Sequence, residues 1–139
     1  MFRLLALSLA VTLATTQVAD AQTNLRTQFN QGMAEFNQLV MEQRLGDALQ
    51  LIRPEVELTD EDIVRIDNQF WENYPKNFVA FGTVRSEALK NGFRQEILAY
   101  WDEDYRYFYV YLMSHSTDNG IKLINVDYSR EFEKLNSFF

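Results

Sequence analysis

The fold is decided by residues 93–128, which run FRQEILAYWDEDYRYFYVYLMSHSTDNGIKLINVDY. Three runs in this stretch are rich in aromatic and β-branched residues, a composition typical of β-strands. They are Phe93–Trp101, Tyr105–Ser114 and Ile121–Tyr128. Two polar turns separate them, Asp102-Glu103-Asp104 and a turn that contains Asn119-Gly120. The stretch therefore predicts consecutive antiparallel strands, a β-meander.

A fourth strand is expected just before this stretch, at Phe78–Leu89. The Asn91-Gly92 pair that follows it is a strong hairpin signal, because both central residues of a type I′ turn need a positive φ. Two-residue loops at Asn91-Gly92 and Asn119-Gly120, with a three-residue loop at Asp102–Asp104, then fix the register of the sheet.

This register sorts the side chains onto two faces. One face collects a set of mostly aromatic residues: Ile97, Trp101, Tyr107, Tyr109, Tyr111, Met113, Ile124, Val126 and Tyr128. The other face mixes charged residues with an apolar group: Leu98, Tyr100, Phe108, Val110, Leu112 and Leu123. We expect the tyrosine-rich face to meet the helices, because its positions on the first strand are small, at Gly82, Val84, Ser86 and Ala88.

Each face then suggests a role. Buried tyrosines need hydrogen-bond partners, so the first face predicts either a core with hydroxyls at its rim or a ligand pocket. The pocket residues would be Trp71, Trp101, Tyr107, Tyr109, Tyr111 and Tyr128. On the second face a contiguous apolar patch predicts an interface, most simply that of a homodimer. The interface residues would be Leu98, Phe108, Val110, Leu112 and Leu123.

Upstream of the sheet the sequence is helical. Leu25, Phe29, Met33, Phe36 and Val40 follow the helical period within residues 24–42. We expect that helix to end near Gly46 and a short helix to run from Ala48 to Ile52, before Pro54. Thr59 and Asp62 form a capping box for a third helix that ends at Tyr74-Pro75. The fold class is therefore α+β, with N-terminal helices packed on a curved four-stranded antiparallel meander.

Residues 1–21 have the layout of a secretory signal peptide, with Arg3, an apolar run and the small-residue site Ala19-Asp20-Ala21. Cleavage is expected before Gln22, which leaves residues 22–139 as one cone-like α+β domain, periplasmic or secreted. The alternative, a membrane-anchoring helix, is disfavoured because the apolar run is shorter than the roughly 20 residues that a span needs. The sequence has no Cys, so a disulfide framework and thiolate chemistry are excluded.

A net charge of −7 argues against a nucleic-acid partner and against adsorption to an anionic membrane once the signal is removed. No cofactor or metal site is expected, since the acidic turns lack the ligand spacing of a calcium loop and His115 is the only imidazole. We interpret Asp102–Asp104 as a solvated turn. The only weak catalytic candidates are His115 and Asp118, near one hairpin end.

Several structural motifs carry a family resemblance. They are Leu45-Gly46-Asp47, Pro54, the cap at Thr59, and Phe81-Gly82-Thr83-Val84 entering the first strand. Over Asn24–Tyr128 the chain resembles the nuclear transport factor 2-like (cystatin-like, α/β cone) superfamily, and within it the small exported bacterial domains of unknown function. The resemblance implies a cone-shaped cavity and frequent dimers through the sheet, but no single activity. The buried Asp or His–Asp pair that enzymes of the ketosteroid isomerase and scytalone dehydratase kind use in the cone has no match here.

The leading hypothesis is an exported non-catalytic binding module. It would take a small apolar or aromatic ligand in the cone, or a protein partner through the sheet. One alternative is a cone-fold enzyme that uses His115 with Asp118. The other is a structural homodimer subunit.

Overall fold

The computed structural model describes residues 14–139. The elements in chain order are α1 (Ala14–Met41), α2 (Leu45–Ile52), α3 (Asp60–Asn73), β1 (Ala80–Ala88), the 3₁₀ turn η1 (Lys90–Gly92), β2 (Phe93–Trp101), β3 (Tyr107–Thr117), β4 (Gly120–Ser129) and α4 (Phe132–Asn136). The strands form one antiparallel four-stranded sheet in the order β1-β2-β3-β4. The predicted α+β class and the meander are confirmed.

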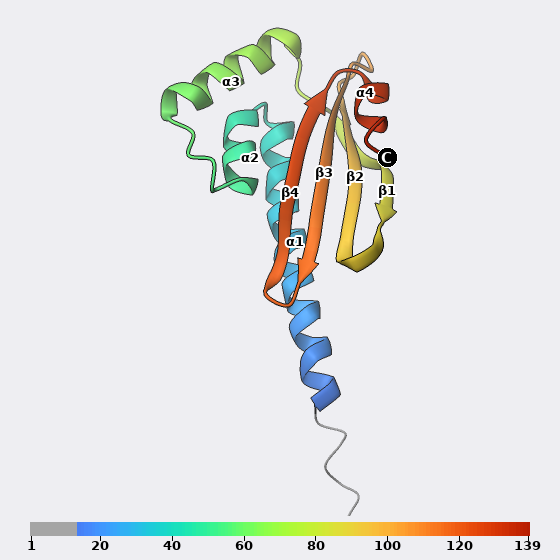
Figure 1. Ribbon diagram of the computed structural model, residues 1–139. Helices are drawn as coiled ribbons and strands as arrows, with labels where there is room; N and C mark the ends of the chain where they lie inside the picture. Colours follow the sequence, from blue (N-terminus) through green and yellow to red (C-terminus); the bar gives the residue numbers. More distant parts are fainter. Residues whose placement is uncertain (1–13) are drawn as a thin grey trace, which may run out of the picture.

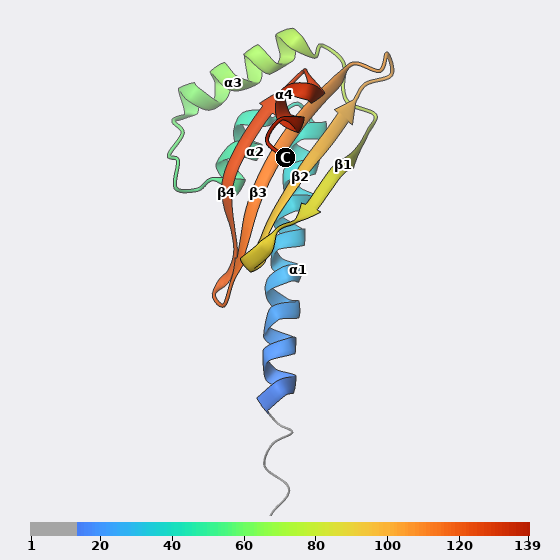
Figure 2. The same cartoon turned by 45° about the vertical axis from the view of Figure 1, so that its right-hand side comes forward.

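The molecule has three layers. Figure 1 shows α1 running along one side of the sheet, with α2 beside it and α3 standing off at the far end. Figure 2 shows the short α4 lying on the opposite side of the curled sheet. In both views the N-terminal part of α1 extends beyond the end of the sheet.

The start of α3 is the predicted capping box. The Thr59 hydroxyl oxygen accepts from the backbone N–H of Asp62 at 3.2 Å, and the Asp62 carboxylate accepts from the backbone N–H of Thr59 at 3.2 Å. Asp60, Glu61 and Asp62 fill the first turn, where acids favour the helix dipole. The helix ends with Tyr74 as its C-cap, as predicted.

The predicted role of Gly46 as the end of a helix is wrong. The break after α1 falls at Gln43, whose φ is 65°, and Gly46 lies inside α2. A Cβ atom at Gly46 would lie 2.9 Å from the backbone of Ile63 in α3. The glycine is therefore required by the close approach of α2 to α3.

The predicted register was wrong in each hairpin. At the first hairpin Leu89 donates to the carbonyl of Phe93, which leaves a three-residue loop, although Asn91 and Gly92 do have the expected positive φ of 60° and 81°. Between β2 and β3, Trp101 pairs with Tyr107, so the loop has five residues rather than three. At the last hairpin Thr117 pairs with Gly120, which puts Asp118 and Asn119 in the turn.

Two bulges alter which residues share a face. The register shifts between Thr83 and Arg85, which leaves Val84 as an extra residue on β1. A second shift makes Ile124 an extra residue on β4. A shift of one residue turns every following side chain to the other face. Val126 therefore pairs with Leu112, and Tyr128 with Val110, on the face opposite to the predicted one.

The prediction of which face meets the N-terminal helices is also wrong. The five predicted interface residues pack in the core beneath the helices: Leu98, Phe108, Val110 and Leu112 are buried, and Leu123 is half-buried against them. Their partners include Phe36 and Val40 of α1, Ala48 of α2 and Phe70 of α3. These five side chains are covered by the protein itself, so they form no exposed interface.

The tyrosine-rich face carries a second, smaller core under α4. Ile97, Tyr111 and Leu135 are buried there, with Tyr109, Met113, Phe132 and Phe139 packed around them. Gln95 donates to the Phe138 carbonyl at 2.9 Å and to the Tyr111 hydroxyl at 2.8 Å. The chain after Ser129 therefore covers the outer face of the sheet, opposite to α1, α2 and α3.

The predicted signal peptide lies partly outside the described residues, which begin at residue 14, and its cleavage before Gln22 stays a prediction. The side chain of Leu25, the first member of the predicted stripe on α1, lies outside the described part as well. Among the residues that the structure describes, none of the helices combines the length and the apolar character that a membrane span requires.

Candidate functional site: a cleft between α3 and the end of β4

A cleft of about 240 Å³ opens where α2 and α3 meet the ends of β3 and β4. Its lining is an apolar and aromatic floor with a polar rim. The lining residues are Leu45, Ile66, Gln69, Phe70, Asn73, Tyr74, Phe108, Tyr128, Ser129 and Arg130. Small-molecule sites commonly combine a mostly apolar wall with a few polar groups that orient the ligand.

Three packed rings make the floor. The ring centroid of Phe70 lies 5.2 Å from that of Tyr74 and 4.8 Å from that of Phe108, in tilted and edge-on arrangements that aromatic pairs favour. Phe70 and Tyr74 come from successive turns at the end of α3, and Phe108 comes from β3. Tyr128 closes the group from β4, 5.8 Å from Phe108.

The hydroxyl of Tyr74 is committed to the structure. It donates to the carbonyl of Tyr107 at 3.0 Å, which ties the end of α3 to the start of β3. Burial raises the pKa of Tyr74 to about 12, although the Arg130 guanidinium acts in the opposite direction. The phenol therefore stays protonated at neutral pH and serves as a hydrogen-bond donor, not as a base.

Arg130 brings the only positive charge to the rim. Its guanidinium lies 5.9 Å from the ring centroid of Tyr74, within the range of a cation–π contact. Its Nη1 donates to the Asn73 side-chain oxygen over a long 3.4 Å. Within residues 14–139 Arg130 forms no ion pair. No Asp or Glu lines the cleft, although the chain carries a net charge of −7.

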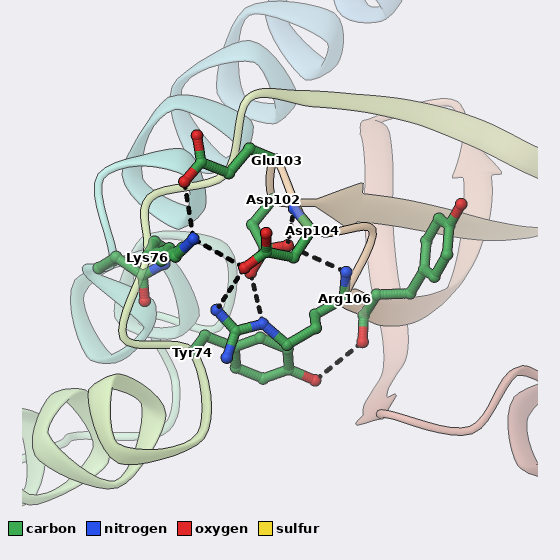
Figure 3. A network of polar contacts seen from close by, with 8 residues as sticks. Tyr74, Lys76, Asp102, Glu103, Asp104 and Arg106 are labelled. Atoms are coloured by element: carbon green, nitrogen blue, oxygen red, sulfur yellow. Dashed lines mark hydrogen bonds and ion pairs between the residues drawn. The ribbon is translucent and has the colours of Figure 1, made fainter.

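The loop between β2 and β3 fixes the backbone that Tyr74 binds. Figure 3 shows the Asp102 carboxylate accepting from the backbone N–H groups of Asp104 at 2.9 Å and Arg106 at 3.0 Å. It also accepts from Nε of Arg106 at 2.7 Å. Burial by itself raises the pKa of Asp102, but these hydrogen bonds and the Arg106 charge hold it below its ordinary value.

The other two acids of this loop pair with a residue just after α3. Lys76 Nζ lies 2.7 Å from the carboxylates of both Glu103 and Asp104, as Figure 3 shows. The interpretation of Asp102–Asp104 as a solvated turn is therefore wrong for Asp102, which is fully buried. A single buried carboxylate organises the loop, and Lys76 connects that loop to the end of α3.

The structure divides the six predicted pocket residues among separate places. Tyr128 lines the cleft, whereas Trp71 is 48% exposed on α3 and does not line it. Trp101, Tyr107 and Tyr109 lie on the outer face, where the rings of Tyr107 and Tyr109 stack at 5.9 Å. Tyr111 is buried beneath the C-terminal segment. These residues do not form one pocket, because the bulge at Ile124 separates Tyr128 from the rest.

His115 and Asp118 are not brought together as a pair. The His115 ring stacks on Phe93 with centroids 4.0 Å apart, and its Nε2 lies 3.1 Å from the carbonyl of Asn91. Among the contacts of the described residues, no hydrogen bond or ion pair joins His115 to Asp118. These contacts with Phe93 and Asn91 at the hairpin end account for the position of His115 without a catalytic role.

The other hollows in the described part of the chain are weaker candidates for a ligand site. An open region of about 410 Å³ between α1 and the sheet contains Arg26 and Arg94, together with the acid Glu96, which lies 3.8 Å from Arg94. Another lies on the solvent side of α3, around Val64. Over residues 14–139 no group of three His, Cys, Asp or Glu side chains is placed to hold a metal ion.

The sequence did not predict that Gln69, Asn73 and Arg130 would form the polar rim of a cleft. One signal was available: Gln69 and Asn73 are spaced by one helical turn, just before the predicted helix end at Tyr74. Arg130 could not be placed, because its position depends on the bulge in β4.

Comparisons of the chain with protein-family models, with curated proteins and with solved structures found no match. A function for this cleft has to rest on its own geometry and chemistry.

Proposed function

We propose that this protein is an exported, non-catalytic binding module that holds a small ligand with an apolar or aromatic body in the cleft between α3 and β4. The observation that carries the proposal is the cleft itself, with three aromatic rings below and amide, hydroxyl and guanidinium groups at its mouth. The rings offer contact area, and the rim offers groups that orient a bound molecule.

The position of the cleft supports membership of the nuclear transport factor 2-like superfamily, which we propose on the same grounds. The helices cover the inner side of a curled meander, and the cleft opens between that side and α3. In a cone fold this is where a cavity would be expected. A homodimer through the outer sheet face also stays a prediction, now carried by exposed residues such as Tyr107 and not by the five core residues.

Nothing in the site favours catalysis over binding. The ionisable groups that line the cleft are Arg130, Tyr74 and Tyr128, and Tyr74 is held as a buried donor. General acid–base chemistry usually needs a group that titrates near the working pH. A binding role requires only the contacts that the cleft already offers.

A titration followed by NMR tests the proposal. The ¹H–¹⁵N spectrum of residues 22–139 is recorded against toluene, 2-phenylethanol, phenylacetate, 2-phenylethylamine and hexanoate. We expect saturable shifts at Gln69, Asn73, Ser129 and Arg130 with one or more of these compounds. Asn73→Trp, which would fill the mouth of the cleft, should abolish them.

The matched control is Asn68→Trp, on the same helix but outside the cleft lining, which should leave binding unchanged. If no compound shifts the rim residues, the small-ligand function is refuted. Export is tested separately, by the mass of the protein recovered outside the cytoplasm, which should begin at Gln22. A recovered chain that still carries residues 1–21 would contradict the predicted cleavage.

A further inference from the structure

From the charge and size of the cleft we infer that its ligand is a small carboxylate with a single ring or short apolar body, and that Arg130 is the residue that binds the carboxylate group. The inference rests on the proposed function and names the ligand class for the same site.

The charge that lines the cleft differs in sign from the net charge of the chain. Arg130 is its one permanently charged side chain, and none of the ten lining residues is acidic. Over the whole sequence acids outnumber bases, at 20 against 13. Outside the cleft, arginines such as Arg44, Arg65 and Arg106 each lie within 3 Å of a carboxylate oxygen. A positive charge without an acidic partner, within a cleft free of acids, favours an anion there.

The chemistry of the Arg130 guanidinium indicates which kind of anion the cleft binds. A guanidinium presents parallel N–H donors that match a carboxylate or a phosphate in a bidentate pair. The side-chain amides of Gln69 and Asn73 line the cleft beside Arg130 and bring further N–H donors. The Asn73 oxygen accepts from Arg130, and the Asn73 amide nitrogen donates to the Gln69 carbonyl at 2.8 Å, which leaves one of its two N–H groups for a ligand. A phosphate carries up to two charges and is bound more often by several cations or by a glycine-rich loop. One arginine with two amides suits the single charge of a carboxylate.

The size of the cleft limits how large the apolar part of the ligand can be. Its volume of about 240 Å³ is below the range of roughly 300–1,000 Å³ typical of drug-sized ligands. An engineered cavity of about 150 Å³ in another protein accommodates benzene. The cleft can therefore hold one ring, or a short chain, together with a carboxylate group. The ring would contact Phe70 and Phe108, and the carboxylate would point outward to Arg130.

Three matched compounds test the inference. Phenylacetate, 2-phenylethanol and 2-phenylethylamine share one ring and a short chain and differ in charge. With the NMR titration above, we expect phenylacetate to bind about tenfold or more tightly than 2-phenylethanol, as a charge-assisted hydrogen bond adds roughly 1.5 kcal/mol or more. The amine should bind most weakly. Raising the salt concentration should weaken phenylacetate binding and leave 2-phenylethanol unchanged.

Two variants assign the preference to Arg130. Arg130→Gln should abolish the preference for phenylacetate over 2-phenylethanol, and Arg130→Lys should retain part of it. Lys122→Gln removes one positive charge from an exposed site on β4 outside the cleft and should change neither affinity. The same spectra report whether each variant is folded.

The possible results distinguish failure of the carboxylate inference from failure of the proposed binding function. If 2-phenylethanol binds in the cleft as tightly as phenylacetate, or if Arg130→Gln keeps the preference, the carboxylate inference is overturned and the binding function stands. If inorganic phosphate displaces phenylacetate at equal concentration, the ligand class is wrong. If none of the five compounds of the titration shifts the rim residues, the inference is overturned together with the proposed function.

Discussion

Asp102 shows how one side chain can hold a candidate binding site in place from outside it. Its carboxylate accepts three hydrogen bonds within its own loop, and the loop presents the Tyr107 carbonyl to Tyr74 on the floor of the cleft. The sequence offered three adjacent acids with nothing to tell them apart. Asp102 differs from Glu103 and Asp104 because it is buried, with its carboxylate facing the backbone N–H groups of Asp104 and Arg106.

The pH dependence of stability tests this role. The pKa of Asp102 is lower in the folded protein than its ordinary value of about 3.9. Such a group stabilises the fold above its unfolded pKa, and this stabilisation is lost as the pH falls through the folded pKa. We expect Asp102→Asn to lower the urea midpoint at pH 7, because an amide N–H₂ would face the donors of Arg106. The deficit should shrink below about pH 4.

Glu103→Gln is the control, since Glu103 is exposed and makes only a surface ion pair with Lys76. Its urea midpoint should stay close to that of the wild type from pH 7 to pH 3. Parallel wild-type and Asp102→Asn curves across the whole range would show that the Asp102 charge does not support the fold.

At the scale of the elements, the contact between α2 and α3 sets one wall of the cleft. Leu45 of α2 and Ile66 of α3 both line it, and Gly46 lets the two helices approach. In an ordinary helix a Gly→Ala change stabilises by up to about 1 kcal/mol. At Gly46 the new methyl group would meet the backbone of Ile63 at 2.9 Å.

We therefore expect Gly46→Ala to destabilise the protein by about 1–3 kcal/mol, the usual cost of overpacking, in urea denaturation at pH 7. Gly32→Ala is the matched change in α1, where nothing lies within 4 Å of the added methyl group. It should be neutral or stabilising by up to about 1 kcal/mol. Equal effects of the two substitutions would rule out the helix contact as the reason for Gly46.

The elements were largely predictable, whereas their faces were not. The Asn91-Gly92 turn, the Thr59 cap and the four strands follow from local chemistry that the sequence displays. The faces depend on bulges at Val84 and Ile124, which no turn signal marks. Moreover, β2 and β3 are apolar on both faces, so alternation could not tell which one meets the helices.

At the scale of the whole molecule, both sides of the sheet are covered. The large core under α1, α2 and α3 and the small core under α4 share the central strands. The face that the sequence alone suggested as a dimer interface lies under α1, α2 and α3, and the tyrosine-rich face lies under α4. The segment that covers the tyrosine-rich face was visible in the sequence as the apolar residues Phe132, Leu135, Phe138 and Phe139. Its position on the sheet could not be predicted, because it depends on where β4 ends.

The small core should contribute measurably to stability. Leu135 is fully buried between α4 and the sheet, so Leu135→Ala should cost about 2–5 kcal/mol in urea denaturation. Leu51→Ala removes the same atoms from a position on α2 that is 37% exposed and should cost much less, about 1 kcal/mol or below. Similar losses for the two variants would mean that α4 is not part of the cooperative fold.

The location of the cleft also has a consequence for hydrogen exchange. One of its walls is β4, an edge strand, and the other is α3, in which only Phe70 is buried. Most residues of the central strands β2 and β3 are buried or half-buried. Local opening that separates α3 from β4 need not disturb those central strands. Under the proposed function, a ligand enters by local separation of α3 from β4, and its binding slows amide exchange in these two elements while leaving β2 unaffected.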